Sequence, residues 1–230
     1  HAYFLRGGDP SVPVVFTVDR IRDGSSFTTR RVVAVQHGRA IFNMSASFHK
    51  QESGYEHQDE MPPGPAPEEL PTWEERAAEF AERIPEHMRE WMFAERPIEM
   101  RSSEGHSWFG GKPSSGPNRV WLRANGPVPE DPMLHACLLA YGSDMGFVDN
   151  MYRPHRKSER DVMIASLDHA MWFHAPIDFS DWHLYELDAP FTGGARGFNR
   201  GLIYNQNGQL AATTAQEGLM RPYKKKEAAS

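Results

Sequence analysis

The chain has 230 residues, a formal net charge of −6 and a single cysteine, Cys137. This charge excludes a general electrostatic attraction to nucleic acid or to an anionic membrane, and one cysteine excludes an intramolecular disulfide. No apolar run approaches the roughly 20 residues of a membrane-spanning helix, and no secretory signal is visible. We therefore expect a cytoplasmic protein without nucleic-acid or membrane partners.

The same pattern occurs twice in the chain, about 170 residues apart. In both 3–48 and 172–216, an aromatic strand precedes a strand that ends in an aspartate, followed by a turn and an alternating run. The matched residues are Phe4 and Phe173, Asp9 and Asp178, Phe16 and Tyr185, Val18 and Leu187, Asp19 and Asp188, Gln36 and Gln206, and Gly38 and Gly208. A fixed offset with matched turn residues indicates two copies of one structural unit.

The two copies differ in what precedes them. About 70 residues, which include a predicted helix, come before the second copy, whereas the first copy begins at His1 within a predicted strand. Because the chain does not begin with methionine, we expect an N-terminal part to be absent, which would carry the strand and helix of the first copy. The predicted division is a first repeat at 1–60, incomplete at its N-terminal side, a linker at 61–95, a second repeat at 96–222 and a tail at 223–230.

The linker is predicted to be a connector packed on the surface. Residues 61–67 are proline-rich, which favours an extended chain without regular hydrogen bonding. A Thr-Trp-Glu-Glu capping box at 72–75 then predicts an acidic helix. Pro85 breaks or kinks this helix before a second short helix at 86–93.

The second repeat is predicted to combine an antiparallel sheet with one long helix. Strand-like segments lie at 98–100 and 120–122, and an Asp-Pro pair at 131–132 supplies the N-cap and first turn of a helix over 133–148. An Asn-Gly pair at 207–208 predicts a hairpin. A helix that is apolar over much of its circumference needs a sheet around it. We therefore predict an α+β fold, a double hot-dog of two sheets joined edge to edge, with the first repeat lacking its N-terminal strand and helix.

Asp144 is the most unusual residue of the predicted helix. It follows Met133, Cys137 and Ala140 at helical spacing, so its carboxylate shares a stripe with apolar groups. It also lies near the C-terminal end of the helix, where the macrodipole disfavours negative charge. Asp144 is therefore either part of a functional site or a residue that reaches water through fraying of the helix end.

A second polar segment follows at 165–174. In one continuous strand, Ser166 and Asp168 would face one side and His169 the other. The spacing of histidine and aspartate here matches no compact metal site, so we expect no metal. A serine nucleophile with a His-Asp relay would lack the usual Gly-x-Ser-x-Gly elbow. The glycine-rich stretch 110–117 lacks the ending of a phosphate loop, and we expect a surface loop there and no cofactor.

Six segments carry long, ordered motifs: 3–6, 18–24, 29–38, 140–144, 166–174 and 215–218. They include Tyr-Phe-Leu-Arg, Ala-Tyr-Gly-Ser-Asp, Ser-Leu-Asp-His and Ala-Gln-Glu-Gly. Together they resemble the acyl-CoA thioesterase II family, over nearly the whole chain outside the linker and the last eight residues. The resemblance implies a double hot-dog fold and an enzyme that hydrolyses acyl-CoA thioesters to a free acid and coenzyme A.

The resemblance also implies a catalytic trio. The family uses an aspartate on the second central helix, a serine or threonine two residues before the Asp-His pair, and the glutamine of Gln-Glu-Gly. These positions are Asp144, Ser166 and Gln216. Asp144 would act as a general base or water orienter, and the other two would hold the same water. One departure is Gly-Gly-Asp at 7–9, where Pro-Gly-Asp is common in the family.

The resemblance further implies an acyl-CoA substrate and association into homo-oligomers through sheet edges, with or without a separate chain that carries the missing N-terminal segment. An alternative is a non-catalytic acyl-CoA-binding hot-dog protein. A hot-dog hydratase is disfavoured because its aspartate and histidine hydration motif is not evident.

Overall fold

The computed structural model describes residues 1–79, 81–83, 86–105, 112–156 and 162–223, without the side chains of residues 83, 87, 88 and 91. The strands are β1 (Ala2–Phe4), β2 (Val15–Asp23), β3 (Phe27–Gln36), β4 (Arg39–His49), β5 (Ile98–Ser102), β6 (Asn118–Ala124), β7 (Val162–Ser166), β8 (Asp168–Phe173), β9 (His183–Gly193), β10 (Arg196–Asn205) and β11 (Leu210–Pro222). The helices are α1 (Trp73–Glu79), α2 (Glu86–Phe93), α3 (Pro132–Asp144) and α4 (Phe147–Asn150), with 3-10 turns η1 (Pro67–Glu69), η2 (Ala81–Arg83) and η4 (Arg153–His155). The predicted loop at 110–117 lies partly outside the described residues, as does the predicted tail after Tyr223.

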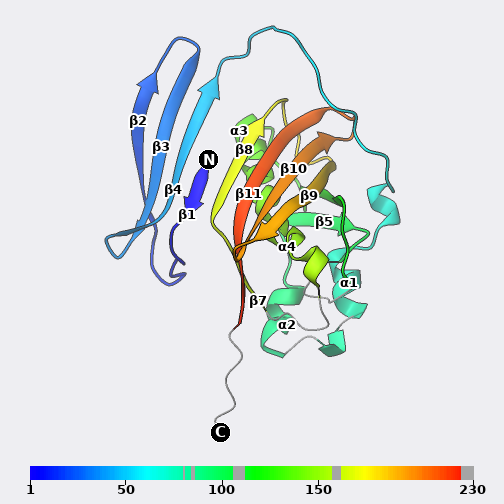
Figure 1. Cartoon of the computed structure of the whole chain (residues 1–230). Coiled ribbons are helices and arrows are strands. Elements are labelled where there is room, and N and C mark those ends of the chain that lie inside the picture. Colours follow the sequence, from blue (N-terminus) through cyan, green and yellow to red (C-terminus); the bar gives the residue numbers. More distant parts are fainter. Residues whose placement is uncertain (80, 84–85, 106–111, 157–161, 224–230) are drawn as a thin grey trace.

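All strands join one antiparallel sheet with the order β2-β3-β4-β1-β8-β11-β10-β9-β6-β5, in which β7 also pairs with β11 (Figure 1). The order is mirrored about the β1–β8 contact. The equivalent strands are β1 and β8, β4 and β11, β3 and β10, and β2 and β9. The strand registers match as well: Phe16 pairs with Ala34 as Tyr185 pairs with Ile203, and Asp19 pairs with Arg31 as Asp188 pairs with Arg200. The repeat in the sequence therefore corresponds to equivalent strand ladders.

The turns that follow β3 and β10 use the matched glycines. Gly38 has φ +68° and Gly208 has φ +78°, values in the left-handed region that favours glycine. The β10–β11 turn is closed by the Gly208 N–H, which donates to the Asn205 carbonyl at 3.0 Å. The hairpin predicted from the Asn-Gly pair is therefore confirmed.

The long helix is shorter than predicted. Asp131 caps it as expected, because its Oδ1 accepts a hydrogen bond from the Met133 N–H at 2.9 Å. However, α3 ends at Asp144, and Gly146 adopts φ +75° before the chain enters α4. The prediction of one helix over 133–148 was therefore wrong. A left-handed residue cannot continue an α-helix, and the turn places Asp144 in the last turn of α3.

The buried face of α3 also differs from the predicted stripe. Met133 is 74% exposed and Cys137 is exposed, whereas His135, Leu139, Gly142 and Ser143 are buried. Gly142 permits this packing, because a Cβ there would lie 3.1 Å from Phe179 Cζ. The sheet packs around this face with a core formed by Ile98, Val120, Leu122, Ala124, Leu139, Phe147, Phe179, Tyr185, Leu187, Ile203 and Ala212.

The first repeat presents an apolar sheet face. Phe16 and Val18 lie in β2, all of which is exposed, and Phe16 is 63% exposed. The pairing registers place Phe16 and Val18 on one face with Phe4, Val32, Ala34, Phe42 and Met44. No described helix packs closely against strands β1 to β4. The second repeat, in contrast, holds α3 and α4 against its sheet.

Residues 50–66, which include the start of the linker, run from β4 along the second repeat as an extended segment (Figure 1). Its backbone carbonyls accept hydrogen bonds from side chains of the sheet: Pro65 from Trp121 Nε1 at 3.0 Å and Pro63 from Arg119 at 2.9 Å. Met61 and Leu70 pack against the cluster of Trp121, Trp182 and Leu184. These side chains compensate for the hydrogen bonds that a proline-rich segment cannot form within itself.

The capping box after the linker is confirmed. The Glu75 N–H donates to Thr72 Oγ1 at 3.1 Å, and the Thr72 N–H donates to Glu75 Oε2 at 2.8 Å. The helix α1 that follows packs against α2 and β5, at the far edge of the sheet. None of the described helices is long and apolar enough to cross a membrane.

Candidate active site

Three elements converge on the inner face of the second repeat: the end of α3, the end of β7 and the middle of β11. Gln216, only 1% exposed, donates a hydrogen bond from Nε2 to Ser166 Oγ at 2.9 Å. The structure therefore brings two of the three residues named from the sequence into direct contact. Asp144 lies at the C-terminal end of α3, and its contact with this region is to His169.

His169 connects Asp144 to the pair. Its Nδ1 forms a short hydrogen bond with Gln216 Oε1 and lies 3.9 Å from Asp144 Oδ1, and its Nε2 lies 3.0 Å from Ser143 Oγ. The Asp144 side chain is 44% exposed, yet its Oδ1 is buried and has no hydrogen-bond partner among the described residues. This carboxylate oxygen therefore lacks a donor in the part of the chain that the structure describes, and its burial destabilises the fold unless a water or ligand donates a hydrogen bond to it.

Ser166 and His169 reach the same partner because of a β-bulge. Ser166 pairs with Gly218 and Ala170 pairs with Ala215, so four steps along β7 and β8 oppose three along β11. An extra residue in one strand changes the side of the sheet on which the following side chains lie. The prediction that Ser166 and His169 face opposite sides was therefore wrong.

The contact between Ser143 and His169 raises the question of a serine nucleophile. Ser143 is fully buried, and its Oγ lies 2.8 Å from the Ala140 carbonyl one helical turn earlier. Ser143 therefore bonds within its own helix. The serine relay considered from the sequence concerned the segment 165–174, whose serine is Ser166, and the structure joins Ser166 Oγ to Gln216 Nε2.

Tyr185 holds the last turn of α3 in place. Its hydroxyl donates to the Ser143 carbonyl at 3.1 Å and lies 2.7 Å from Thr214 Oγ1. Burial raises the pKa of Tyr185 well above its ordinary value, and the Asp144 charge raises it further, although the Thr214 contact lowers it. Tyr185 therefore remains a neutral donor to one of the terminal carbonyls of α3. A Cβ at Gly201 would lie 2.1 Å from Tyr185 Cε2, so glycine is needed for the ring to occupy this place.

Sequence reasoning missed two polar residues of this region. His169 had a signal, because it belongs to the Asp-His pair, but the alternation placed it on the wrong face. Asn199 had no clear signal. It is fully buried, its strand register places it opposite Gln216, and neither of its amide atoms has a hydrogen-bond partner among the described residues.

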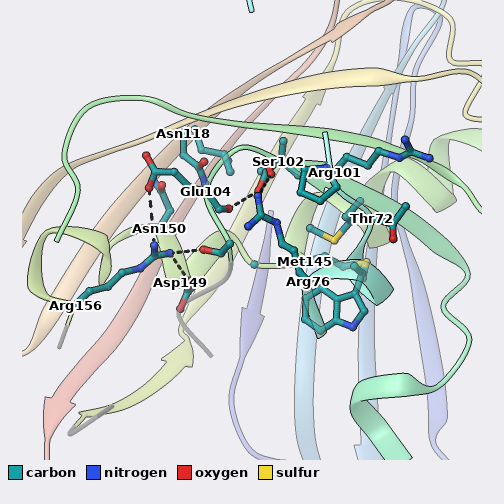
Figure 2. A pocket seen from close by; sticks show the side chains of 17 residues that line it. Thr72, Arg76, Arg101, Ser102, Glu104, Asn118, Met145, Asp149, Asn150 and Arg156 are labelled. Carbon is teal, nitrogen blue, oxygen red and sulfur yellow. Dashed lines mark hydrogen bonds and ion pairs between the residues drawn. The ribbon is translucent and has the colours of Figure 1, made fainter. Parts of the chain in front are cut away.

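Met145, the residue that follows Asp144, lines two pockets. One has a volume of about 230 Å³ and is lined by Trp73, Met100 and Met145, with Arg96 and Glu99 among the polar lining residues. The other, about 50 Å³, is shown in Figure 2 and is lined by polar residues such as Arg76 and Asn118 together with apolar ones such as Trp73 and Met100. Within the described part of the chain, no three His, Cys, Asp or Glu side chains are grouped so that they could hold a metal ion.

The smaller pocket borders an ionic network that ties the segment after β5 to α4 and η4. Arg153 makes two hydrogen bonds to Glu104, at 2.6 and 3.1 Å. Arg156 lies 3.4 Å from Asp149 Oδ2, and Figure 2 shows these two residues beside Glu104. Burial raises the pKa of Glu104, but hydrogen bonds from Arg153 and Ser114 and the charges of Arg153 and Arg156 outweigh it and hold that pKa below its ordinary value. The charges of the network are therefore paired, and they hold the segment after β5 against α4 and η4.

Two family models match the chain. A model described as acyl-CoA thioesterase matches residues 87–219, and a model of the acyl-CoA thioesterase N-terminal domain matches residues 1–49. The chain belongs to the acyl-CoA thioesterase family. The family expected from the sequence motifs is therefore confirmed, and the protein is a thioester hydrolase.

Individual relatives agree with this assignment. The thioesterase is 38% identical over 223 residues to acyl-CoA thioesterase 2 of Haemophilus influenzae, a match that covers 96% of this chain and 78% of the relative. It is 40% identical over 229 residues to acyl-coenzyme A thioesterase 8 of Homo sapiens, and this match covers 96% of this chain and 72% of the human protein.

Solved structures support the fold. The acyl-CoA thioesterase II TesB2 from Mycobacterium marinum superposes with a TM-score of 0.78 and 40% identity, over 97% of this chain and 79% of that one. A hot-dog protein from Alicyclobacillus acidocaldarius, at 21% identity and a TM-score of 0.75, covers 96% of this chain and 77% of its own and shows the fold alone. The α+β hot-dog architecture of this thioesterase is therefore confirmed.

Proposed function

We propose that this thioesterase hydrolyses acyl-CoA thioesters to a free acid and coenzyme A, using a water held by Asp144, Ser166 and Gln216. The observation that carries the proposal is the buried Asp144 Oδ1, which has no hydrogen-bond partner among the described residues and lies 3.9 Å from the ring that contacts Gln216. A water bound there would satisfy this oxygen and lie beside two further polar side chains.

The proposed reaction begins with attack of the water oxygen on the thioester carbonyl carbon. Asp144 accepts the proton that the water loses, and a tetrahedral intermediate with an oxyanion forms. When this intermediate collapses, the carbon–sulfur bond breaks, coenzyme A leaves as a thiolate, and the proton held by Asp144 neutralises it. Ser166 and Gln216 contribute by fixing the position of the water before attack, which lowers the entropic cost of the step.

The relatives support the substrate class, since the compared proteins from Haemophilus influenzae and Homo sapiens are named acyl-CoA thioesterases. The alternative is a protein that binds acyl-CoA without turnover. A thiol-trapping dye distinguishes the two, because hydrolysis releases one free thiol for each substrate consumed. Continuous thiol release that scales with protein concentration is expected. Acyl-CoA binding without thiol release would favour the alternative.

A further inference from the structure

We propose that His169 is a positioning residue that sets the orientation of the Gln216 amide, and thereby decides that Gln216 offers a donor to the reacting groups. The inference deepens the proposed function and rests on it for its kinetic effect. His169 contacts Gln216, Asp144 and Ser143, which lie on two different elements, β11 and α3.

The contact between the two side chains fixes the amide. A carbonyl oxygen can only accept, so the short hydrogen bond between His169 Nδ1 and Gln216 Oε1 requires a proton on Nδ1. The amide NH2 of Gln216 is then directed to Ser166 Oγ at 2.9 Å, and its second N–H is left for the water or the thioester. With the amide reversed, Gln216 would present an acceptor at that place and could no longer donate to Ser166.

The contacts on the other side of the ring allow a proton on Nδ1. Ser143 Oγ lies 3.0 Å from His169 Nε2 and 2.8 Å from the Ala140 carbonyl. When the Ser143 hydroxyl donates to Nε2, the one proton of a neutral ring is on Nδ1, the tautomer that the contact with Gln216 Oε1 requires. Asp144 Oδ1 lies 3.9 Å from the same nitrogen.

The ring itself is held rigidly. Its side chain is 12% exposed, and its edge meets the ring of Phe147, with centroids 5.7 Å apart at an angle of 74°. The bulge between β7 and β8 directs it toward Gln216. A group whose own position is fixed by packing and hydrogen bonds can hold a reacting residue in one geometry.

Two substitutions separate the two sides of the ring. The amide nitrogen of asparagine lies near the place of Nδ1, whereas that of glutamine lies near Nε2. We expect His169→Asn to keep a donor for Gln216 and to retain kcat within about twofold of the parent. His169→Gln keeps a partner for Ser143 but loses that donor, and its kcat should fall by about 10-fold, the loss expected for Gln216→Ala, with KM unchanged. His174, which bonds Thr213 on the exposed part of the sheet, is the matched control for both changes.

The double variant His169→Gln with Gln216→Ala should be no slower than the slower single variant, because residues that act as one unit are non-additive. Equal losses of kcat in His169→Asn and His169→Gln would contradict the proposal, since a packing role would not distinguish the two sides of the ring. Losses that multiply in the double variant would contradict it as well.

Nitrogen-15 NMR of the histidine ring tests the orientation without catalysis. We expect a protonated His169 Nδ1 in the parent protein, and a changed Nδ1 signal in Gln216→Ala. An unprotonated Nδ1 would overturn the proposal even in an active enzyme. A third outcome is that Nδ1 is protonated in the parent protein but Gln216→Ala turns over at the parent rate. The proposed role of Gln216 in hydrolysis would then fail, and the inferred orientation of its amide would stand.

Discussion

Asp144 combines two properties that rarely occur together in a carboxylate. Its side chain is 44% exposed, so substrate can reach it, yet its Oδ1 is buried without a hydrogen-bond partner in the described part of the chain. Such an oxygen destabilises the folded protein, because it loses its hydrogen bonds to water and gains none from the described residues. This arrangement is expected where a bound water or substrate completes the hydrogen bonding.

Ser166 and Gln216 should matter less than Asp144 if they only position the water. We expect Ser166→Ala and Gln216→Ala each to lower kcat by about 10-fold, and their combination with Asp144→Asn to add little further loss. Steady-state assays with a thiol-trapping dye measure these values. Losses in the combined variants that equal the product of the single losses would argue for independent roles.

At the residue scale, the sequence predicted the trio through its resemblance to the family, and the structure places Ser166 and Gln216 in contact. His169 could not be assigned to the same face, because strand alternation holds only while the register is unbroken. The extra residue between Ser166 and Ala170 has no signature in the residues themselves. It becomes visible only through the partners on β11.

At the element scale, features set by local residues were predictable and features set by packing were not. The capping box at Thr72, the cap at Asp131 and the hairpin at Gly208 depend on side chains within a few residues. The buried face of α3 depends on Phe179 and on β5, whose Ile98 lies close to Gly142. The apolar composition of this helix leaves several faces equally able to be buried.

The ionic network beside α4 should make stability depend on pH. Because the pKa of Glu104 is lowered on folding, its contribution is present above its ordinary value of about 4.3 and is lost as pH falls through the folded value. Glu104→Gln should reduce the free energy of unfolding at pH 7 by about 1 to 2 kcal/mol, since the carboxylate is partly exposed.

Denaturant unfolding at several pH values measures this effect. The difference between the parent and Glu104→Gln should shrink as pH falls from the ordinary pKa of a glutamate toward the lowered pKa of Glu104, because the unfolded chain takes up the proton first. The exposed residue Glu68 provides the control, Glu68→Gln. A difference between the parent and Glu104→Gln that stays constant from pH 7 to pH 3.5 would contradict the proposed role of the charge.

At the scale of the whole molecule, the two repeats meet along a short seam. Pairing across it involves Ala2 with His169 and Tyr3 with Asp168, so the seam adjoins the residue that contacts Gln216. The sequence predicted the repeat, because matched turns and strands recur at a constant offset. The edge-to-edge joining of the sheets was part of the predicted double hot-dog fold. The order of strands across the seam required the structure.

The exposed apolar face of the first repeat should be detectable in solution. Contiguous apolar patches on a surface bind hydrophobic dyes and promote association. We expect Phe16→Ser with Val18→Ser to lower dye binding and self-association of the chain, whereas Thr17→Ser, on the opposite face of β2, should change neither. Dye fluorescence and light scattering measure the two effects. If the double variant and Thr17→Ser changed dye binding and self-association equally, this face would not be the source of either effect.

The most direct test of the central claim is kcat for Asp144→Asn. This change keeps the shape of the side chain and removes the basic oxygen, so kcat for acyl-CoA hydrolysis should fall by roughly 100-fold or more. Circular dichroism and acyl-CoA binding should match the parent, which limits the effect to the chemical step. A variant that folds, binds acyl-CoA and turns over at the parent rate would contradict the assignment of Asp144 as the group that activates the water.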